Sequence, residues 1–241
     1  MTGLVPSPNA PETVCRAVYD ETAAFYAALL PGLGPAARGY EILYGPPLRA
    51  PPILFIGTQP GGTRVSHHRA LGADLGGTWP EGCEYATAPW PMAAHMRAMF
   101  GAPLLSRCTG TNAVFLRAPD VATYRREVPA ALRREAAAFC RARVERMVCA
   151  MRPARIVAIG FDSLAAFGPT APVLRSPSGR ILLRTGTVCG RPATATLHLT
   201  GAWMTAADRA AMTAGLLAED RQGQGSALDS QRAVGPFDPL T

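Results

Sequence analysis

The stretch "ILFIGTQPGG", residues 53–62, shows which kind of fold this chain adopts. Four apolar residues follow two prolines and run into Gly57, and then a polar pair, a proline and two glycines take over. A short apolar run bounded by turn residues predicts a buried strand, as in parallel sheets covered on both faces. The Pro-Gly turn predicts a sharp exit from that strand, with the carboxamide of Gln59 at its centre.

Apolar runs and helical patterns alternate along the rest of the chain. Strands are predicted at 111–118 and 155–160, with one or two more between 180 and 199. Helices are predicted at 13–30, 90–100, 129–151 and 205–220, with a short one from Asp162, as N-cap, to Phe167. Pro31 is expected to end the first helix, and Thr205 and Asp208 are spaced much like a capping box.

Strands that alternate with helices predict an α/β fold. We expect a three-layer α/β/α sandwich with a central, mostly parallel four-stranded sheet. With 241 residues and 48% hydrophobic composition, the chain is long enough for one full core, which we place at residues 1–220. Residues 221–241 are polar, Gly-rich and aperiodic, so we expect a tail that orders only against a partner or not at all.

The composition excludes several classes of protein. No apolar run approaches the roughly 20 residues that cross a bilayer, and the N-terminus lacks the basic and apolar regions of a secretion signal. We therefore expect a cytoplasmic monomer with no membrane partner. The six cysteines are scattered without a CxxC pair, so we expect buried thiols rather than disulfides, and no structural zinc or iron–sulfur cluster.

The charge is strongly basic. The net charge is +7, and every basic residue is arginine. Biased codon usage would produce this composition, and so would an anionic partner, because guanidinium pairs with phosphate through two parallel hydrogen bonds. Charge alone does not decide between these explanations, although it is compatible with a nucleic-acid partner.

Three polar stretches lie at or next to the ends of apolar strands: residues 57–62, Asn112 with its neighbours, and residues 198–203. In parallel sheets the ligand site lies beyond the carboxyl ends of the strands. Each stretch alone has an ordinary structural explanation: a Gly-Pro turn, a polar side chain that satisfies backbone groups, and a buried histidine. Their order along the chain makes a shared site the better interpretation.

This arrangement resembles the uracil-DNA glycosylase superfamily. Members carry a Gly-x-x-Pro-Gly-type turn after the first core strand, an Asn after or within the second, often as "TN", and a His-Pro-Ser-type loop before the last helix. The corresponding stretches here are "GTQPGG" (57–62), "TNAVFLRAPD" (111–120) and "HLTGAW" (198–203). The segment "IVAIGFDSLAAFG" (156–168) is similar to the family's strand–glycine–helix unit, and the resemblance covers residues 53–219 in order.

The resemblance implies an enzyme that everts a nucleotide of DNA and hydrolyses its N-glycosidic bond, without a metal or organic cofactor. Asn112 would bind uracil O4 and N3–H through its carboxamide, and His198 would stabilise the negative charge that develops on the departing base. Gln59 completes the catalytic set. The implied base- and DNA-binding residues are Gly57, Thr58, Pro60, Gly61, Gly62, Trp79, Tyr85, Arg117, Thr200, Gly201 and Trp203.

The first turn departs from the family pattern at two positions. The best-known branch has an aspartate where this chain has Gln59, and one branch that reads "GEQPG" also has Gln there. A carboxamide takes up no proton near neutral pH, so Gln59 would hold or polarise water rather than act as a base, and slow turnover is expected. A bulky Tyr that blocks thymine in the best-known branch is replaced by Gly61, so exclusion of thymine is not assured.

The histidine loop also departs from the pattern, because Leu199 and Thr200 replace the proline and serine. Thr200 keeps a hydroxyl for phosphate contact. Trp203, with Met204, is a candidate wedge for the gap that an everted base leaves, although a Trp before a helix usually packs into the core. Trp79 and Tyr85 compete as the aromatic that stacks on the base.

Other charged residues surround the predicted site in sequence. Arg64, Arg117 and Arg175 are candidates for phosphate contact. The pair His67 and His68 has no third ligand at suitable spacing, so no metal site is predicted.

Two other functions stay open. In the first, the fold serves only to bind nucleic acid, and catalysis is lost together with the acidic residue. A small-molecule hydrolase or transferase that holds phosphate at the first turn is a third class, although the turn lacks the pattern of a P-loop or a dinucleotide site.

Overall fold

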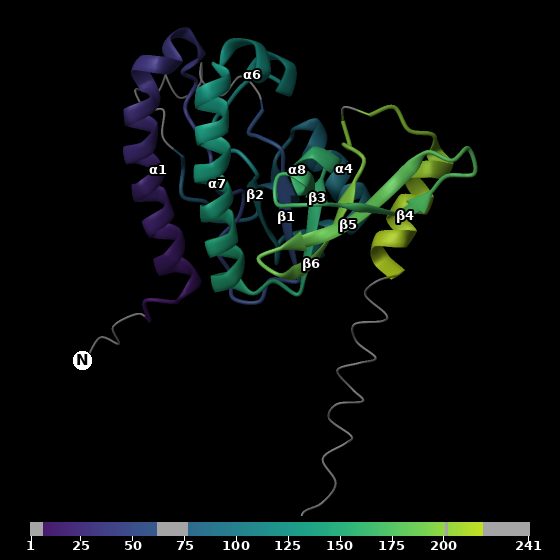
Figure 1. Cartoon of the computed structure of the whole chain (residues 1–241). Coiled ribbons are helices and arrows are strands. Elements are labelled where there is room, and N and C mark those ends of the chain that lie inside the picture. The colour runs from purple at the N-terminus through teal and green to yellow at the C-terminus, as the bar shows by residue number, and fades with distance from the viewer. Residues whose placement is uncertain (1–6, 62–76, 201, 219–241) are drawn as a thin grey trace, which may run out of the picture.

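A computed structural model of the protein describes residues 7–61, 77–200 and 202–218. Its strands are β1 (Ile53–Gly57), β2 (Thr109–Asn112), β3 (Arg155–Ile159), β4 (Ala171–Arg175), β5 (Ile181–Val188) and β6 (Arg191–Thr196). The helices are α1 (Pro11–Leu33), η1 (Gly34–Ala36), α3 (Glu84–Thr87), α4 (Pro91–Phe100), α5 (Ala102–Leu105), α6 (Val121–Glu127), α7 (Ala130–Met151) and α8 (Phe161–Ala165), followed by a helix over 206–218. Figure 1 shows their arrangement.

The strands form one mixed sheet in the order β2-β1-β3-β6-β5-β4. Strands β2, β1, β3 and β6 are parallel, and β5 and β4 add an antiparallel edge. The α/β class and the mostly parallel sheet are therefore confirmed, whereas the predicted number of four strands is wrong, because the sheet has six. Strand β4 was missed because its side chains are mostly exposed, so no buried apolar run marks it.

Helices cover both faces of the sheet. Side chains alternate along the buried strands, so each strand contributes to the core on both faces. Leu54 and Ile56 of β1 face a core that α1 and α7 complete. Ile53 and Phe55 face the opposite way, into a core that includes side chains of α4 and of the helix over 206–218. Figure 1 shows α1 and α7 side by side at one side of the sheet. The three-layer arrangement predicted from the sequence therefore describes this structure.

Two predicted boundaries are wrong for local reasons. Helix α1 continues past Pro31 to Leu33, because a proline this close to a helix end removes only one backbone hydrogen bond. Strand β2 ends at Asn112, where the predicted strand 111–118 only begins. The apolar run that suggested a strand lies in the following loop, where Phe115 and Leu116 are buried in the core.

Of the two predicted N-caps, Thr205 is confirmed and Asp162 is wrong. Asp162 is not the N-cap of α8, because the helix begins at Phe161 after Gly160, whose φ is +99°. The Asp162 carboxylate instead pairs with exposed Arg125 at 3.1 Å. Ahead of the last helix, the Thr205 hydroxyl accepts a hydrogen bond of 3.0 Å from the backbone N–H of Asp208, so the predicted cap by Thr205 is confirmed.

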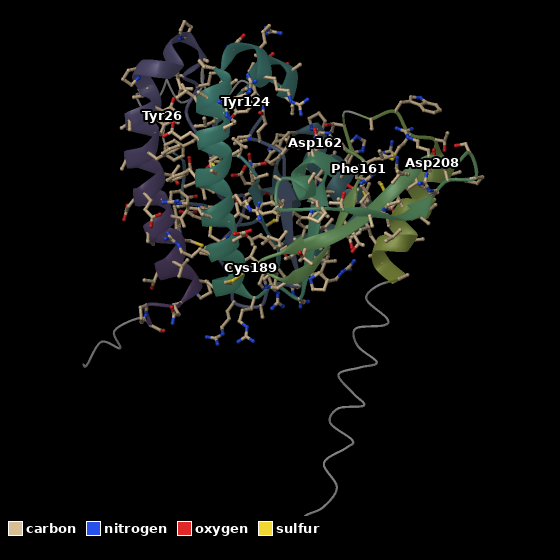
Figure 2. The ribbon with its side chains drawn as sticks, in the orientation of Figure 1. Tyr26, Tyr124, Phe161, Asp162, Cys189 and Asp208 are labelled. Carbon is tan, nitrogen blue, oxygen red and sulfur yellow. A yellow bond between two sulfur atoms is a disulfide. The ribbon has the colours of Figure 1, made fainter. Side chains whose placement is uncertain are left out.

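The prediction that the cysteines are free thiols rather than disulfides is wrong for two of the six. Cys149, on α7, and Cys189, in the turn between β5 and β6, form a disulfide across 40 residues of sequence. Figure 2 shows where Cys189 lies. Their spacing gives no signal, because the pairing depends on how α7 packs against the sheet. The other four cysteines are free and buried: Cys15, Cys83, Cys108 and Cys140.

Among the described helices, none combines the length and the apolar composition required to cross a bilayer.

Candidate functional site

The three polar stretches reach the same edge of the sheet. Gly57 and Asn112 are register partners at the ends of the parallel strands β1 and β2. On the other side of β1, Ile159 of β3 is paired with Thr196 of β6, and His198 follows two residues later. Because these four strands are parallel, their carboxyl ends share one edge, where ligands bind in open α/β sheets.

Backbone hydrogen bonds hold the first turn against the segment that follows β2. The N–H groups of Ala113, Val114 and Ala118 donate to the carbonyls of Gly57, Thr58 and Pro60 at 2.8, 3.0 and 3.2 Å. This ladder continues the pairing of β1 and β2 past the last register pair. The turn is therefore held along most of its length, although Gly61 is exposed and Gly62 lies outside the described residues.

Gln59 is half-buried at the centre of this turn. Its amide nitrogen donates to the backbone carbonyl of Ala118 at 3.5 Å. The bond engages the nitrogen end of the carboxamide, and the oxygen end is the part that can accept a hydrogen bond from water.

Asn112 is almost fully buried, with 3% of its surface exposed. Its amide nitrogen donates to the Tyr44 hydroxyl at 3.1 Å. Its carboxamide oxygen lies directly over Gly57, because a Cβ atom on that glycine would be only 2.4 Å from the oxygen. Gly57 therefore supplies the space that the Asn112 side chain occupies.

Aromatic rings surround Asn112 on this side of the sheet. Tyr44 stacks on Tyr85 with ring centroids 5.6 Å apart, and Trp90 lies 5.6 Å from Tyr44. Tyr85 packs closely over Gly110 of β2, two residues before Asn112. Tyr44 and Trp90 were missed by sequence reasoning, since they lie outside the motifs. Only the tertiary structure brings Tyr44 to Asn112 and Trp90 to Tyr44.

The structure separates the two aromatics between which the sequence could not choose. Trp79 packs against α1, where Tyr19 is 5.2 Å away and the Arg16 guanidinium lies 3.7 Å from the ring centroid. Tyr85 instead lies in the layer beside Asn112. Tyr85 therefore shares a layer with Asn112, whereas Trp79 does not, and the Tyr85 ring packs against Tyr44 and Phe55.

His198 follows β6, and its ring lies near Gly160, the residue after β3. Its Cδ2 atom and the Thr58 hydroxyl are 3.4 and 3.6 Å from the position of a Cβ on Gly160. The Thr58 hydroxyl is hydrogen-bonded to Ser163 of α8 at 2.8 Å. Ser163 was not predicted as a site residue, and it connects the first turn to α8.

The imidazole of His198 has a second polar neighbour in its own loop. The Thr200 hydroxyl lies 3.3 Å from Nδ1. Burial lowers the pKa of His198 below its usual value of 6.5, which favours the neutral ring at pH 7. A neutral ring that accepts at Nδ1 carries its proton on Nε2 and can donate there.

Asn112 and His198 thus approach the ends of neighbouring strands. The carboxamide lies over Gly57 of β1, and the imidazole lies near Gly160, directly after β3. The carboxamide lies in the layer of Tyr44 and Tyr85. The imidazole instead borders α8, whose Leu164 packs into the core of α1 and α7. The two side chains therefore reach the same edge of the sheet from different layers of the sandwich.

The arginines predicted to contact phosphate are engaged elsewhere. Arg117 is 5% exposed and forms a buried ion pair with Glu41, which also accepts from the backbone N–H of Thr78. Arg175 donates to the carbonyl of Gly179 in the turn between β4 and β5. This placement makes Arg117 a structural residue rather than the exposed phosphate contact that we predicted, and Arg64 lies outside the described residues.

The loop after His198 presents one large exposed side chain. Trp203 is 77% exposed, so the alternative explanation, that it packs into the core, is excluded. Met204 is buried, which excludes it from the predicted wedge. Arg180 donates to the backbone carbonyl of Trp203 and ties this loop to the start of β5. Gly201 lies outside the described residues.

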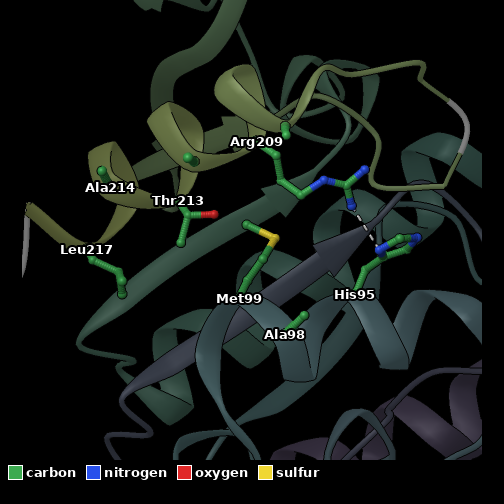
Figure 3. Close-up of a pocket in the computed structure, with 9 residues that line it drawn as sticks. His95, Ala98, Met99, Arg209, Thr213, Ala214 and Leu217 are labelled. Atoms are coloured by element: carbon green, nitrogen blue, oxygen red, sulfur yellow. Dashed lines mark hydrogen bonds between the residues drawn. The ribbon is translucent and has the colours of Figure 1, made fainter.

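A separate cavity of about 550 Å³ lies between α4 and the helix over 206–218 (Figure 3). Its lining is mostly apolar, and one polar pair crosses it, in which Arg209 donates to Nδ1 of His95 at 3.0 Å. None of the residues predicted from the sequence lines this cavity. Within the described ranges, no three metal-ligating side chains are grouped to hold an ion, and His67 and His68 lie outside those ranges.

Comparison with known proteins does not assign the chain to a family. No protein-family model matches it, and no curated protein matches its sequence. The function of the site therefore has to follow from its own residues.

Proposed function

We propose that the protein is a DNA glycosylase that excises uracil, or a related deaminated base, by everting the nucleotide and hydrolysing its N-glycosidic bond. The observation that supports this most directly is the buried Asn112 carboxamide, which lies over Gly57 at the carboxyl end of β1 with the His198 imidazole at the end of the neighbouring strand. Both residues lie at the carboxyl edge of the parallel strands, where ligands bind in open α/β sheets, and this position supports the proposal.

Recognition of the base would come from Asn112. Uracil presents an acceptor, O4, beside a donor, N3–H, and a carboxamide offers the complementary donor and acceptor. The pairing is selective only in a site that excludes water, because unpaired polar groups are then costly. The burial of Asn112 supports this requirement.

Cleavage would depend on His198. When the bond between the sugar C1′ and the base N1 breaks, its electron pair stays with the base, and negative charge develops mainly on O2. A neutral imidazole that donates from Nε2 would stabilise this charge, which is absent in the ground state. The lowered pKa of His198 favours the neutral ring, and the Thr200 hydroxyl can donate to Nδ1 of the tautomer that carries its proton on Nε2.

The sugar cation would then be captured by water at Gln59. The oxygen of its carboxamide would accept a hydrogen bond from the attacking water while Ala118 holds the nitrogen end. The carboxamide takes up no proton, so the proton released by water goes to solvent or to the base anion. This arrangement positions the nucleophile without a general base, and slow turnover is the expected consequence.

DNA would approach the exposed Trp203. Its 77% exposure, five residues after His198, fits a side chain that enters the base stack when the nucleotide is everted. The net charge of +7 supports a polyanionic partner and predicts binding that weakens with salt.

One alternative is favoured by a specific observation. Gln59 stands where an acid would activate water, so the protein could bind uracil-containing DNA without cleaving it. Tight, salt-sensitive binding without release of base would support this alternative.

A single-turnover assay separates the two functions. The substrates are single-stranded oligonucleotides with and without one uracil, and the readout is alkali-sensitive strand cleavage. Glycosylase activity predicts cleavage that is lost in His198→Ala and Asn112→Asp. His95→Ala is a matched control, because His95 is paired with Arg209 in the separate cavity and should keep wild-type activity. Absence of cleavage by the wild-type protein would overturn the proposal.

A further inference from the structure

We infer that Tyr44 is a positioning residue, which holds the Asn112 carboxamide in the orientation that accepts uracil and rejects cytosine. This inference rests on the proposed function of Asn112 as the base-binding residue. It starts from a single buried contact, the 3.1 Å hydrogen bond from the Asn112 amide nitrogen to the Tyr44 hydroxyl, across 68 residues of sequence.

The Tyr44 hydroxyl is itself held in place. The backbone N–H of Tyr44 donates to the carbonyl of Gly110 at 2.8 Å, and its carbonyl accepts from the N–H of Glu84 at the same distance. Its ring packs against Tyr85 and Trp90. Because both the backbone and the ring are fixed, the hydroxyl offers Asn112 a partner at a defined position.

The carboxamide is enclosed between two features. The Tyr44 hydroxyl accepts a hydrogen bond from the amide nitrogen of Asn112, and Gly57, which has no side chain, leaves space for the carboxamide oxygen. An amide nitrogen has two N–H groups, so one can bond to Tyr44 while the other remains for a ligand beside the carboxamide oxygen. The contact with Tyr44 therefore orients the edge of the Asn112 carboxamide, made of its oxygen and its second N–H, that would pair with uracil.

The orientation matters because uracil and cytosine present opposite patterns. Uracil offers an acceptor at O4 and a donor at N3, whereas cytosine offers a donor at N4 and an acceptor at N3. A half-turn of the carboxamide exchanges its donor and acceptor and converts a uracil-binding edge into a cytosine-binding one. Burial raises the pKa of Tyr44 to about 12, so the hydroxyl keeps its proton throughout the range in which an enzyme is assayed.

Tyr44→Phe tests the inference, because it removes only the hydroxyl and keeps the ring. Misplacement of a reacting or binding group by about 1 Å can cost about 100-fold in rate. We expect single-turnover excision of uracil to fall by about 10- to 100-fold, with a smaller ratio of uracil to cytosine excision. Binding to undamaged DNA should not change, since Tyr44 is buried.

The matched control is Tyr124→Phe. Tyr124, on α6, is also a buried tyrosine, and among the described residues its hydroxyl has no hydrogen-bond partner (Figure 2). Excision by this variant should stay within about twofold of wild type. A fall as large as that in Tyr44→Phe would mean that loss of any buried hydroxyl perturbs the enzyme, and it would overturn the inference.

A double-mutant cycle separates positioning from a general structural effect. If Tyr44 acts through Asn112, Tyr44→Phe should cause no further loss in the Asn112→Ala background. Two losses that simply multiply would show that Tyr44 acts independently of Asn112, which contradicts the inference.

The side-chain amide protons of Asn112 give a readout that does not need catalysis. In the wild-type protein we expect two resolved resonances with slow solvent exchange, assigned by their loss in Asn112→Ala. In Tyr44→Phe they should exchange at least about tenfold faster, whereas unchanged exchange would refute the positioning role. If the wild-type protein does not excise uracil, the proposed function fails, and these resonances alone decide whether Tyr44 positions Asn112.

Discussion

The carboxamide oxygen of Asn112 occupies the space that a side chain at Gly57 would need, only 2.4 Å from the position of its Cβ. The two residues are register partners at the ends of β1 and β2, so the contact is built into the sheet. A glycine at the end of the first strand therefore does more than permit a turn, because it makes room for the proposed base-binding side chain.

Gly57→Ala should displace Asn112 and weaken the fold. Overpacking of this kind typically costs about 1–3 kcal/mol in the free energy of unfolding, and the shifted carboxamide should also abolish base excision. Urea denaturation and the excision assay measure the two effects. Gly82→Ala is the control, because no non-neighbouring atom of the described residues lies within 4 Å of the position of its Cβ, and it should leave both quantities unchanged. Wild-type stability in Gly57→Ala would contradict the close contact.

Stability and activity should both depend on the protonation of His198. Burial lowers the pKa of the folded-state ring below 6.5, so folding favours the neutral form. The resulting stabilisation is complete above pH 6.5 and is lost as the pH falls through the folded-state pKa. Excision should fall over the same range, because the proposed mechanism uses the neutral ring, which protonation removes.

The measurement compares urea unfolding and single-turnover rates between pH 8 and pH 5 in the wild type and in His198→Gln. The variant should lose this part of the pH dependence of stability. An identical pH dependence in both proteins would rule out His198 as its source.

Arg117→Ala should destabilise the protein strongly rather than only weaken DNA binding. It leaves the Glu41 carboxylate buried without its ion-pair partner, which typically costs about 3–5 kcal/mol. Chemical denaturation measures this loss, and the double variant Glu41→Gln with Arg117→Met should recover part of it. If Arg117→Ala keeps wild-type stability but lowers DNA affinity and its salt dependence, Arg117 is a phosphate contact after all.

Trp203→Ala should affect DNA and leave the fold intact. Because 77% of this side chain is exposed, the free energy of unfolding should change by less than about 0.5 kcal/mol. Excision from duplex DNA should fall more than excision from single strands, since only the duplex has a stacked gap to fill. Met204→Ala provides the contrast: Met204 is buried, and its truncation should cost about 2–5 kcal/mol. Equal loss on both substrates would argue against a wedge.

The parts of the fold that were predictable carry local signals. The buried strand β1, the long helix α7 and the short helix α4 each have a residue pattern that requires no knowledge of their neighbours. Strand β2 was misplaced because its polar sequence, "TGTN", is buried by its partners rather than by its own apolarity. The disulfide between Cys149 and Cys189 was not predicted either, because only tertiary packing brings α7 to the β5–β6 turn.

The sequence by itself determined the α/β class, the mostly parallel sheet and the placement of Gly57, Asn112 and His198 at or just beyond the ends of their strands, because hydrophobic periodicity and turn residues are local properties. The tertiary structure alone decided which groups those side chains meet. Asn112 bonds to Tyr44, Arg117 to Glu41 and Thr58 to Ser163. These pairs are 68, 76 and 105 residues apart, and such contacts form only when the packed sheet brings distant segments together.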